Sequence, residues 1–243
     1  MNYKSILILL LVGLTLSCSD DVVTPEEEFD YRDYMILDTG SYWVYQSYGI
    51  ESNGNIFLNS FAFDSTFIMD SLYLSGRNAI KMGNRNIVQG KSATNEFYYS
   101  LDSNQISILG ITLAVNDLFN IVTDDWITLY DQYRGNWFNI PLGFNDTTIG
   151  GSTYNGFIRF DGYNEGSTKI EYQGKKIKAF TTHLVIKYEI EQMSDTLRII
   201  DKREQYSYRF AKDIGLVYTK YLEYQDSVLV GGYEKIIDDY KVK

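Results

Sequence analysis

The chain has one cysteine, one histidine and two prolines among its 243 residues. Because there is no second cysteine, no disulfide can form within the chain, and its stability must come from packing and sheet hydrogen bonds. The two prolines, Pro25 and Pro141, leave room for long uninterrupted strands. The low counts of histidine and cysteine also exclude zinc sites built from these residues, and neither a metal nor another cofactor is predicted.

Basic residues are also few, because 22 Lys and Arg stand against 32 Asp and Glu, for a formal net charge of −10. Such a surface repels nucleic acid and anionic lipid head groups, since phosphate binding depends on Lys and Arg. No basic cluster reverses this balance locally, so nucleic acid is not expected as a partner. The sequence also has no Walker loop and no dinucleotide-binding fingerprint.

The first eighteen residues have the organisation of an export signal. Lys4 and the amino terminus supply positive charge, and an apolar run of eleven residues follows. This run is shorter than the about 20 residues that span a bilayer, but it fits the h-region of a signal peptide. Residues 14–18 (Leu-Thr-Leu-Ser-Cys) resemble the lipobox of bacterial lipoproteins, with Thr15 in place of the usual leucine. The resemblance implies cleavage after Ser17 and acylation of Cys18; the alternative is an ordinary secretory signal.

Removal of residues 1–17 takes away only Lys4 among the charged residues, so the mature chain has a net charge of −11. Residues 18–35 are polar and acidic and predict a tether, and residues 36–243 predict a single β-rich domain. Two or more acyl chains on Cys18 would hold the protein stably at a membrane, since each buried methylene contributes about 0.8 kcal/mol. The predicted location is the outer membrane of the cell envelope, either surface-exposed or periplasmic.

The aromatic content is high, with 22 Tyr, 13 Phe and 3 Trp, and these residues favour pleated, half-buried surfaces. From residue 36 onward, apolar and polar residues alternate with the period of a strand. We predict an all-β fold, an antiparallel meander curled into a half-barrel or barrel, with few or no helices. Strands are predicted at residues 42–48, 57–70, 72–74, 79–82, 97–101, 106–109, 126–130, 154–160, 167–172, 177–191, 196–210, 215–225 and 228–242. Residues 57–70 could be one long strand or two short ones. Residues 115–122 predict one helical turn, and residues 134–151 predict mostly a loop.

Two segments resemble stretches that occur together in secreted bacterial β proteins. Residues 208–218 resemble an aromatic strand that turns at glycines and re-enters the sheet, with Asp213 where the first glycine usually stands. Residues 40–45 (Gly-Ser-Tyr-Trp-Val-Tyr) resemble an opening strand that accompanies it. Such proteins resemble the LolA/LolB-like lipoprotein-carrier half-barrels and related uncharacterised families. The resemblance implies a curved sheet whose apolar concave face could hold an acyl chain.

The candidate catalytic groups are few. His183 is the only histidine that a Ser-His-Asp site could use, no Gly-x-Ser-x-Gly elbow accompanies it, and a strand histidine is the simpler interpretation. Asp124 and Asp125 beside Trp126, with Asp131 nearby, could act as a glycosidase-like carboxylate group or form a solvated turn. No catalytic residue is therefore predicted.

Aromatic side chains are the candidate ligand-binding residues. Trp43 lies in an aromatic strand and is predicted to be in the core. Trp137 and Phe138 lie in a Gly- and Asn-rich segment, where an exposed aromatic pair could bind a ligand. Trp126 is the third candidate, and it could stack on a sugar ring or line a lipid cavity.

Three functional hypotheses remain open. The first is a non-enzymatic envelope lipoprotein whose curved sheet binds or shelters a lipid or acyl chain. The second is a surface module that binds a glycan or a protein through Trp137 and Phe138. The third is a carboxylate-dependent hydrolase around Asp124 and Asp125. One fold hosts many activities, so the predicted half-barrel does not choose among them.

Overall fold

The computed structural model describes residues 30–88, 91–102, 105–109, 112–116, 119–122, 125–194 and 197–243. One compact unit spans residues 31–243. Cys18 and the predicted signal peptide lie outside the described residues. Tyr34 and Met35, at the end of the predicted tether, are buried with 2% and 7% of their surface exposed. The compact unit therefore begins at Tyr31, ahead of the predicted boundary at residue 36.

The described residues contain one short 3-10 helix and fourteen strands. Their bounds are η1 (Tyr31–Tyr34), β1 (Tyr42–Ile50), β2 (Ile56–Leu74), β3 (Arg77–Val88), β4 (Lys91–Asp102), β5 (Gln105–Leu109), β6 (Thr112–Asn116), β7 (Phe119–Val122), β8 (Ile127–Asp131), β9 (Asn136–Ile149), β10 (Ser152–Tyr172), β11 (Lys175–Met193), β12 (Leu197–Ala211), β13 (Gly215–Gln225) and β14 (Val228–Lys241).

Twelve of these strands form one sheet in the order β8-β5-β4-β3-β2-β1-β14-β13-β12-β11-β10-β9, and β6 and β7 pair separately. All pairs are antiparallel, and most neighbours are consecutive in the chain, so the predicted all-β meander is confirmed. The two edge strands, β8 and β9, follow each other in sequence but share no ladder among the described residues. The sheet is therefore open and curled, and it is not a closed barrel.

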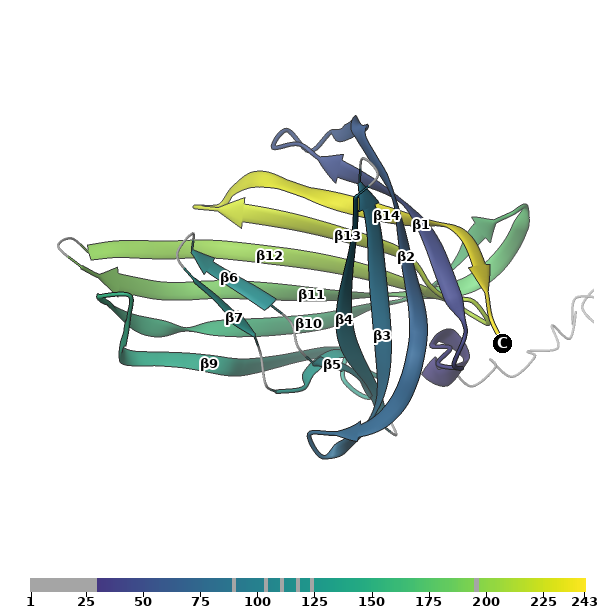
Figure 1. Ribbon diagram of the computed structural model, residues 1–243, viewed down its shortest axis with the longest axis horizontal. Helices are drawn as coiled ribbons and strands as arrows, with labels where there is room; N and C mark the ends of the chain where they lie inside the picture. The colour runs from purple at the N-terminus through teal and green to yellow at the C-terminus, as the bar shows by residue number, and fades with distance from the viewer. Residues whose placement is uncertain are drawn as a thin grey trace, which may run out of the picture. The chain divides into compact units, whose positions relative to one another are not determined.

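The two ends of the sheet order pack against each other. Figure 1 shows β2, β3 and β4 crossing steeply in front of β10 to β13. The side chains between them form the core, and the predicted core residue Trp43 is only 3% exposed and donates its indole N–H to Ile214 O at 2.6 Å. In β11, the alternating side chains of Leu184, Ile186 and Tyr188 are each at most 1% exposed, which confirms the predicted half-buried strand.

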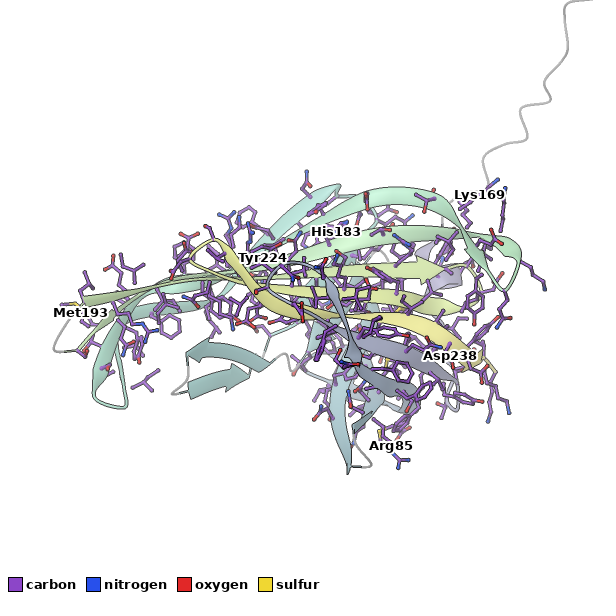
Figure 2. The ribbon with its side chains drawn as sticks, turned by 90° about the horizontal axis from the view of Figure 1, so that it is seen from above. Arg85, Lys169, His183, Met193, Tyr224 and Asp238 are labelled. Carbon is purple, nitrogen blue, oxygen red and sulfur yellow. The ribbon has the colours of Figure 1, made fainter. Side chains whose placement is uncertain are left out.

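The second half of the chain has the longest strands. Strand β10 has 21 residues and β11 has 19, and Figure 2 shows Lys169 and Met193 at opposite ends of these strands. The sequence predicts two strands in the region of β10, at residues 154–160 and 167–172. They form one strand because a register shift between Asn164 and Gly166 carries the ladder across the polar middle.

Three side chains fasten the edge strand β8 to the opposite edge of the sheet. Thr182 Oγ1 donates to Leu129 O at 2.8 Å, and Trp137 Nε1 donates to Thr128 O at 2.9 Å. Asn164 Nδ2 donates to Asp131 O at 3.0 Å. We call these contacts of Thr182, Trp137 and Asn164 with β8 the closure seam. They hold the curl where no ladder joins the edges.

Two secondary-structure predictions are wrong. The helical turn predicted within residues 115–122 is instead the β6–β7 hairpin, whose sequence is rich in strand-forming Thr, Val, Ile and Phe. The loop predicted at residues 134–151 is largely β9. Because β9 is an edge strand, it pairs only with β10, and many of its polar side chains face solvent, so it lacks the apolar pattern of an internal strand.

The turn between β12 and β13 has left-handed backbone geometry. Secreted β proteins that resemble residues 208–218 usually have a glycine where Asp213 stands. Asp213 has a φ of 60° and Gly215 a φ of 98°. Aspartate tolerates this region better than most residues, because its short polar side chain can bond locally. The Asp213 N–H donates to Asp33 O at 2.8 Å, which ties η1 to this turn.

Candidate functional site

A cleft of about 300 Å³ lies on the inner face of the sheet and is lined by strands β1 to β5 and β12 to β14. Four tyrosines line it: Tyr45, Tyr99, Tyr208 and Tyr233. We call it the tyrosine cleft. Its other walls carry Thr66, Asn84, Asn95, Phe97, Ile108, Leu216, Thr219 and Lys235. The volume lies at the lower end of the range of small-molecule sites, about 300–1,000 Å³.

The strand register explains how distant residues come together in the cleft. Tyr208 pairs with Thr219 between β12 and β13, and Thr219 pairs with Lys235 between β13 and β14. Directly paired residues point to the same face of a sheet, so these three side chains form one row on the inner face. Tyr99 comes from β4, on the far side of the curl.

The tyrosine hydroxyls fall into two groups. The Tyr45 hydroxyl donates to Leu216 O at 2.9 Å. Within the described part of the chain, the hydroxyls of Tyr99, Tyr208 and Tyr233 form no hydrogen bond with a protein atom. Tyr99 is only 6% exposed. None of these three oxygens is among the fully buried polar atoms without a partner in the described residues, so the hydroxyls face the cleft, where water or a ligand can reach them.

The three hydroxyls remain protonated at neutral pH. Burial, reinforced by the negative charges of Asp64 and Glu204, raises the pKa of Tyr233 to about 12. Burial likewise raises the pKa values of Tyr99 and Tyr208 above the usual value near 10, with smaller contributions from neighbouring groups. Each hydroxyl is thus a neutral group that can donate one hydrogen bond and accept others.

The charged groups of the cleft are paired with each other. Asp64 is 1% exposed, and it accepts hydrogen bonds from Lys235 Nζ and, at 2.6 Å, from Asn84 Nδ2. Asn84 Nδ2 also lies 3.3 Å from Thr66 Oγ1. Because the lysine and the carboxylate offset each other, the cleft has no uncompensated charge among its lining residues.

A layer of packed rings and buried charges supports the cleft. Tyr206 stacks on Tyr208 with ring centroids 6.0 Å apart and interplanar angle 4°, and it also contacts Tyr221 at 4.9 Å. The Tyr206 hydroxyl donates to Glu204 Oε2 at 3.0 Å, and Lys202 Nζ lies 2.9 Å from Glu204 Oε1. These contacts fix the position of Tyr206, and through it the position of Tyr208.

An apolar subpocket of about 50 Å³ adjoins the tyrosine cleft. The two cavities share Tyr45, Thr66, Phe97, Tyr99 and Leu216. The subpocket is otherwise lined by Met35, Ile36, Leu37, Trp43, Met82, Phe210 and Gly215. An apolar cavity of about 150 Å³ accommodates one benzene ring, so this subpocket is too small for an acyl chain.

A larger depression of about 570 Å³ lies over the ends of β10 to β12. Its lining includes the consecutive residues Tyr188, Glu189, Ile190 and Glu191. Successive side chains of a strand point to opposite faces, so these groups do not converge on one ligand. We therefore regard the tyrosine cleft as the candidate site.

The structure does not bring the predicted ligand-binding residues together. Trp137 is 9% exposed in the closure seam, with its indole ring over Gly162, and Phe138 is 73% exposed on β9. They are therefore not an exposed pair on a loop, and their role in ligand binding stays a prediction. Trp126 donates its indole N–H to Ser75 O at 3.2 Å, beside the Arg77 guanidinium. None of the three lines the tyrosine cleft.

His183 lies in a polar cluster away from the tyrosine cleft. Its Nδ1 is 2.9 Å from Ser207 Oγ, its Nε2 is 3.2 Å from Glu165 Oε2, and its ring stacks on Tyr163. These contacts resemble a Ser-His-Glu arrangement. The paired strands β11 and β12 are hydrogen-bonded on both sides along this stretch, so their backbone N–H groups are used in the sheet and form no oxyanion hole.

The predicted carboxylate group lies only partly within the described residues. Asp124 lies outside the described residues, and Asp125 is exposed. Asp131 is buried, and its carboxylate accepts hydrogen bonds from the backbone N–H groups of Tyr133 and Arg134 and from Gln105 Nε2. These bonds give Asp131 a structural role at the end of β8.

Metal-ligand clusters and membrane-spanning helices are both missing from the described residues. Within the residues that the structure describes, no three His, Cys, Asp or Glu side chains are placed to hold a metal ion. None of the helices in those residues is long and apolar enough to cross a bilayer.

An open, curled antiparallel sheet with a polar, aromatic cleft on its inner face defines the structural class of the protein. No protein-family model matches the chain, and no curated protein matches it. Among solved structures, it is similar to a "putative lipoprotein" from Parabacteroides distasonis ATCC 8503, with 12% identity and a TM-score of 0.43. It is also similar to a "putative exported protein with YmcC-like fold" from Bacteroides fragilis NCTC 9343, with 8% identity and a TM-score of 0.44.

Each likeness covers 86% of this chain and 98% of the other. At these TM-scores, neither assigns a function to this chain. The resemblance to LolA/LolB-like half-barrels stays a prediction.

Little in the sequence indicates which residues form the cleft. Tyr99, Tyr208 and Tyr233 are three of 22 tyrosines, and each lies in a strand where tyrosine is common. The alternation of side chains along a strand predicts that Tyr206 and Tyr208 share one face. It does not predict that β4 meets β12 and β14.

Proposed function

We propose that the protein is a lipid-anchored envelope protein that binds a hydroxyl-rich ligand, such as a glycan segment, in the tyrosine cleft without catalysing a reaction. The observation that carries the proposal is the set of three hydroxyls, on Tyr99, Tyr208 and Tyr233, that line one cleft and bond no protein atom among the described residues. Sugar hydroxyls both donate and accept hydrogen bonds, as these phenols do. Aromatic rings with polar handles are suited to ligands that have apolar and wet sides.

The cleft favours a polar ligand over an acyl chain. Its lining includes Asn95 and Thr219, and a bound chain of methylenes would take the amide of Asn95 and the hydroxyl of Thr219 out of water. The apolar subpocket beside it holds only about 50 Å³. The hypothesis of a sheltered lipid therefore receives less support from this geometry than the glycan hypothesis.

Absence of catalysis is supported by the placement of the reactive groups. The cleft is lined by tyrosines, amides and one lysine paired with Asp64, and among the described residues it contains no histidine and no pair of carboxylates. His183 is not among the residues that line the cleft, and its ring nitrogens contact Ser207 and Glu165. General acid–base chemistry needs a group within hydrogen-bond reach of the ligand.

The anchor can be tested separately from the cleft. In the Cys18→Ala variant, we expect the protein to move from the membrane fraction to the soluble fraction, because no lipid can be attached. Mass spectrometry of the unchanged protein is expected to show an acylated amino-terminal Cys18. Full retention of the variant at the membrane would contradict the proposed anchor.

The cleft is tested by titrating the purified chain with cell-surface polysaccharide fragments and, separately, with palmitate. Tyr99→Phe, Tyr208→Phe and Tyr233→Phe are each expected to weaken glycan binding by about two- to tenfold, since a hydrogen bond contributes roughly 0.5–1.5 kcal/mol. Tyr218→Phe is the matched control, because Tyr218 pairs with Arg209 on the other face and bonds Glu234. Stoichiometric palmitate binding that the cleft variants do not change would overturn the proposal.

A further inference from the structure

We infer that the tyrosine cleft and its apolar subpocket together recognise an N-acetylated amino sugar. This inference rests on the proposed function and adds the class of sugar. The acetamido methyl would enter the subpocket, while the sugar ring and its hydroxyls would occupy the tyrosine cleft.

The subpocket has the size of a short apolar group. The subpocket measures about 50 Å³. A cavity of about 150 Å³ accommodates one benzene ring, so the subpocket has room for roughly two to three heavy atoms. Its distinctive lining is apolar and includes Met82, Trp43 and Phe210. A hydroxyl placed there would lose its hydrogen bonds to water, whereas a methyl group would gain from leaving water.

Tyr99 marks the junction where the amide of the acetamido group would lie. It lines both the cleft and the subpocket, it is only 6% exposed, and its hydroxyl has no protein partner among the described residues. Its O–H can donate to the acetamido carbonyl. The phenol is neutral, because burial keeps its pKa above the usual range, so this donor persists across physiological pH.

The charge of the cleft favours a neutral sugar over an acidic one. Lys235 already pairs with the buried carboxylate of Asp64. The carboxylate of Glu204 is a further negative charge that acts on Tyr208 and Tyr233. An anionic sugar would find no uncompensated cation, and the chain as a whole has a net charge of −10.

The test compares two soluble disaccharides that differ only in the groups in question, N,N′-diacetylchitobiose and cellobiose, by calorimetry or ligand-observed NMR on the purified full chain. We expect diacetylchitobiose to bind at least about fourfold more tightly, which is the gain from burying one methyl group. Equal affinity for the two sugars would overturn the inference and leave the proposed glycan binding intact. Binding of neither sugar would also overturn it, and the proposed function would then be judged by the polysaccharide titration.

Two variants at one position sharpen the test. Ile36 lines the subpocket but not the cleft, and it is half-buried, so a larger side chain can be accommodated there without repacking the core. Ile36→Phe should fill the subpocket and remove the preference for diacetylchitobiose while cellobiose binding persists. Ile36→Ala, the matched control, should keep the preference. A preference that survives Ile36→Phe unchanged would contradict the placement of the acetamido methyl.

Discussion

The closure seam and the tyrosine cleft both use side chains with polar handles, and they use them in opposite ways. In the closure seam, the donors of Trp137, Thr182 and Asn164 each bond a backbone carbonyl of β8 at 2.8–3.0 Å. In the tyrosine cleft, the hydroxyls of Tyr99 and Tyr233 line a cavity and bond no described protein atom.

The difference separates residues that hold the fold from residues that are available to a ligand. A donor that bonds the backbone stabilises the curl, and losing it leaves a buried carbonyl without a partner. A hydroxyl that bonds nothing within the protein contributes little to stability, and its removal can even be favourable. Substitutions in the two regions should therefore affect different measurements.

The largest expected effect is that of Trp137→Ala in the closure seam. Loss of a buried aromatic side chain should lower the free energy of unfolding by about 3–5 kcal/mol, as measured by chemical denaturation. Phe138→Ala is the control, because Phe138 is 73% exposed, and its change should stay within about 0.5 kcal/mol. Similar losses for the two variants would contradict the placement of the indole in the seam.

A smaller loss is expected when the seam is overfilled. In Gly162→Ala, the new Cβ would lie 2.0 Å from Trp137 Cε2, so the indole must shift. We expect the free energy of unfolding to fall by about 1–3 kcal/mol, the usual range for an overpacked core. Gly143→Ala is the control, because nothing lies within 4 Å of its added Cβ. Gly174→Ala is unsuitable, because Gly174 has a positive φ that alanine disfavours. Equal stability of the Gly162 and Gly143 variants would place the indole elsewhere.

The two groups of hydroxyls in the tyrosine cleft offer a finer comparison. Tyr45→Phe removes the donor to Leu216 O and should lower the free energy of unfolding by about 1 kcal/mol. Tyr99→Phe removes a hydroxyl without a protein partner, so its stability should be unchanged or slightly higher. Thermal and denaturant unfolding of the two variants measures this difference, and a greater loss for Tyr99→Phe would show that its hydroxyl has a partner.

Alkaline pH offers a test that needs no substitution. Burial raises the pKa of Tyr233 to about 12 and, with the carboxylate of Glu234, that of Tyr218 to about 12, against about 10 in an unfolded chain. Between these values the unfolded chain releases protons that the folded chain retains, so stability present below pH 10 should decline from about pH 10 to 12.

This decline is measured by denaturant titration at several pH values, and tyrosine absorbance reports the ionisation directly. Tyr233→Phe should make the decline less steep. Ionisation of all tyrosines together near pH 10 in the folded protein would contradict the raised pKa values.

Much of the fold could be predicted from the sequence where a strand has one buried face. In β11, the alternation of Leu184, Ile186 and Tyr188 with polar residues defined the strand without any tertiary information. The edge strand β9 could not be found in this way, because it pairs on one side only and its polar residues face solvent. The role of Trp137 could not be predicted either, because its contact with β8 depends on how the sheet curls.

The tyrosine cleft was beyond sequence reasoning because some of its walls come from strands that are far apart in the sheet order. Tyr99 belongs to β4 and Tyr208 to β12, and no periodic pattern links two strands that meet only when the sheet curls. Whether a tyrosine hydroxyl has a partner depends on the same tertiary arrangement. Composition indicated that tyrosine matters, but only the register and the curl identify which ones.

The most direct test of the central claim is non-denaturing mass spectrometry of the protein purified from the cells that make it, beside its Tyr99→Phe/Tyr233→Phe variant. We predict a bound species with the mass of a saccharide fragment in the unchanged protein, reduced or lost in the variant. A bound species with the mass of a lipid, present equally in both proteins, would contradict a glycan-binding tyrosine cleft.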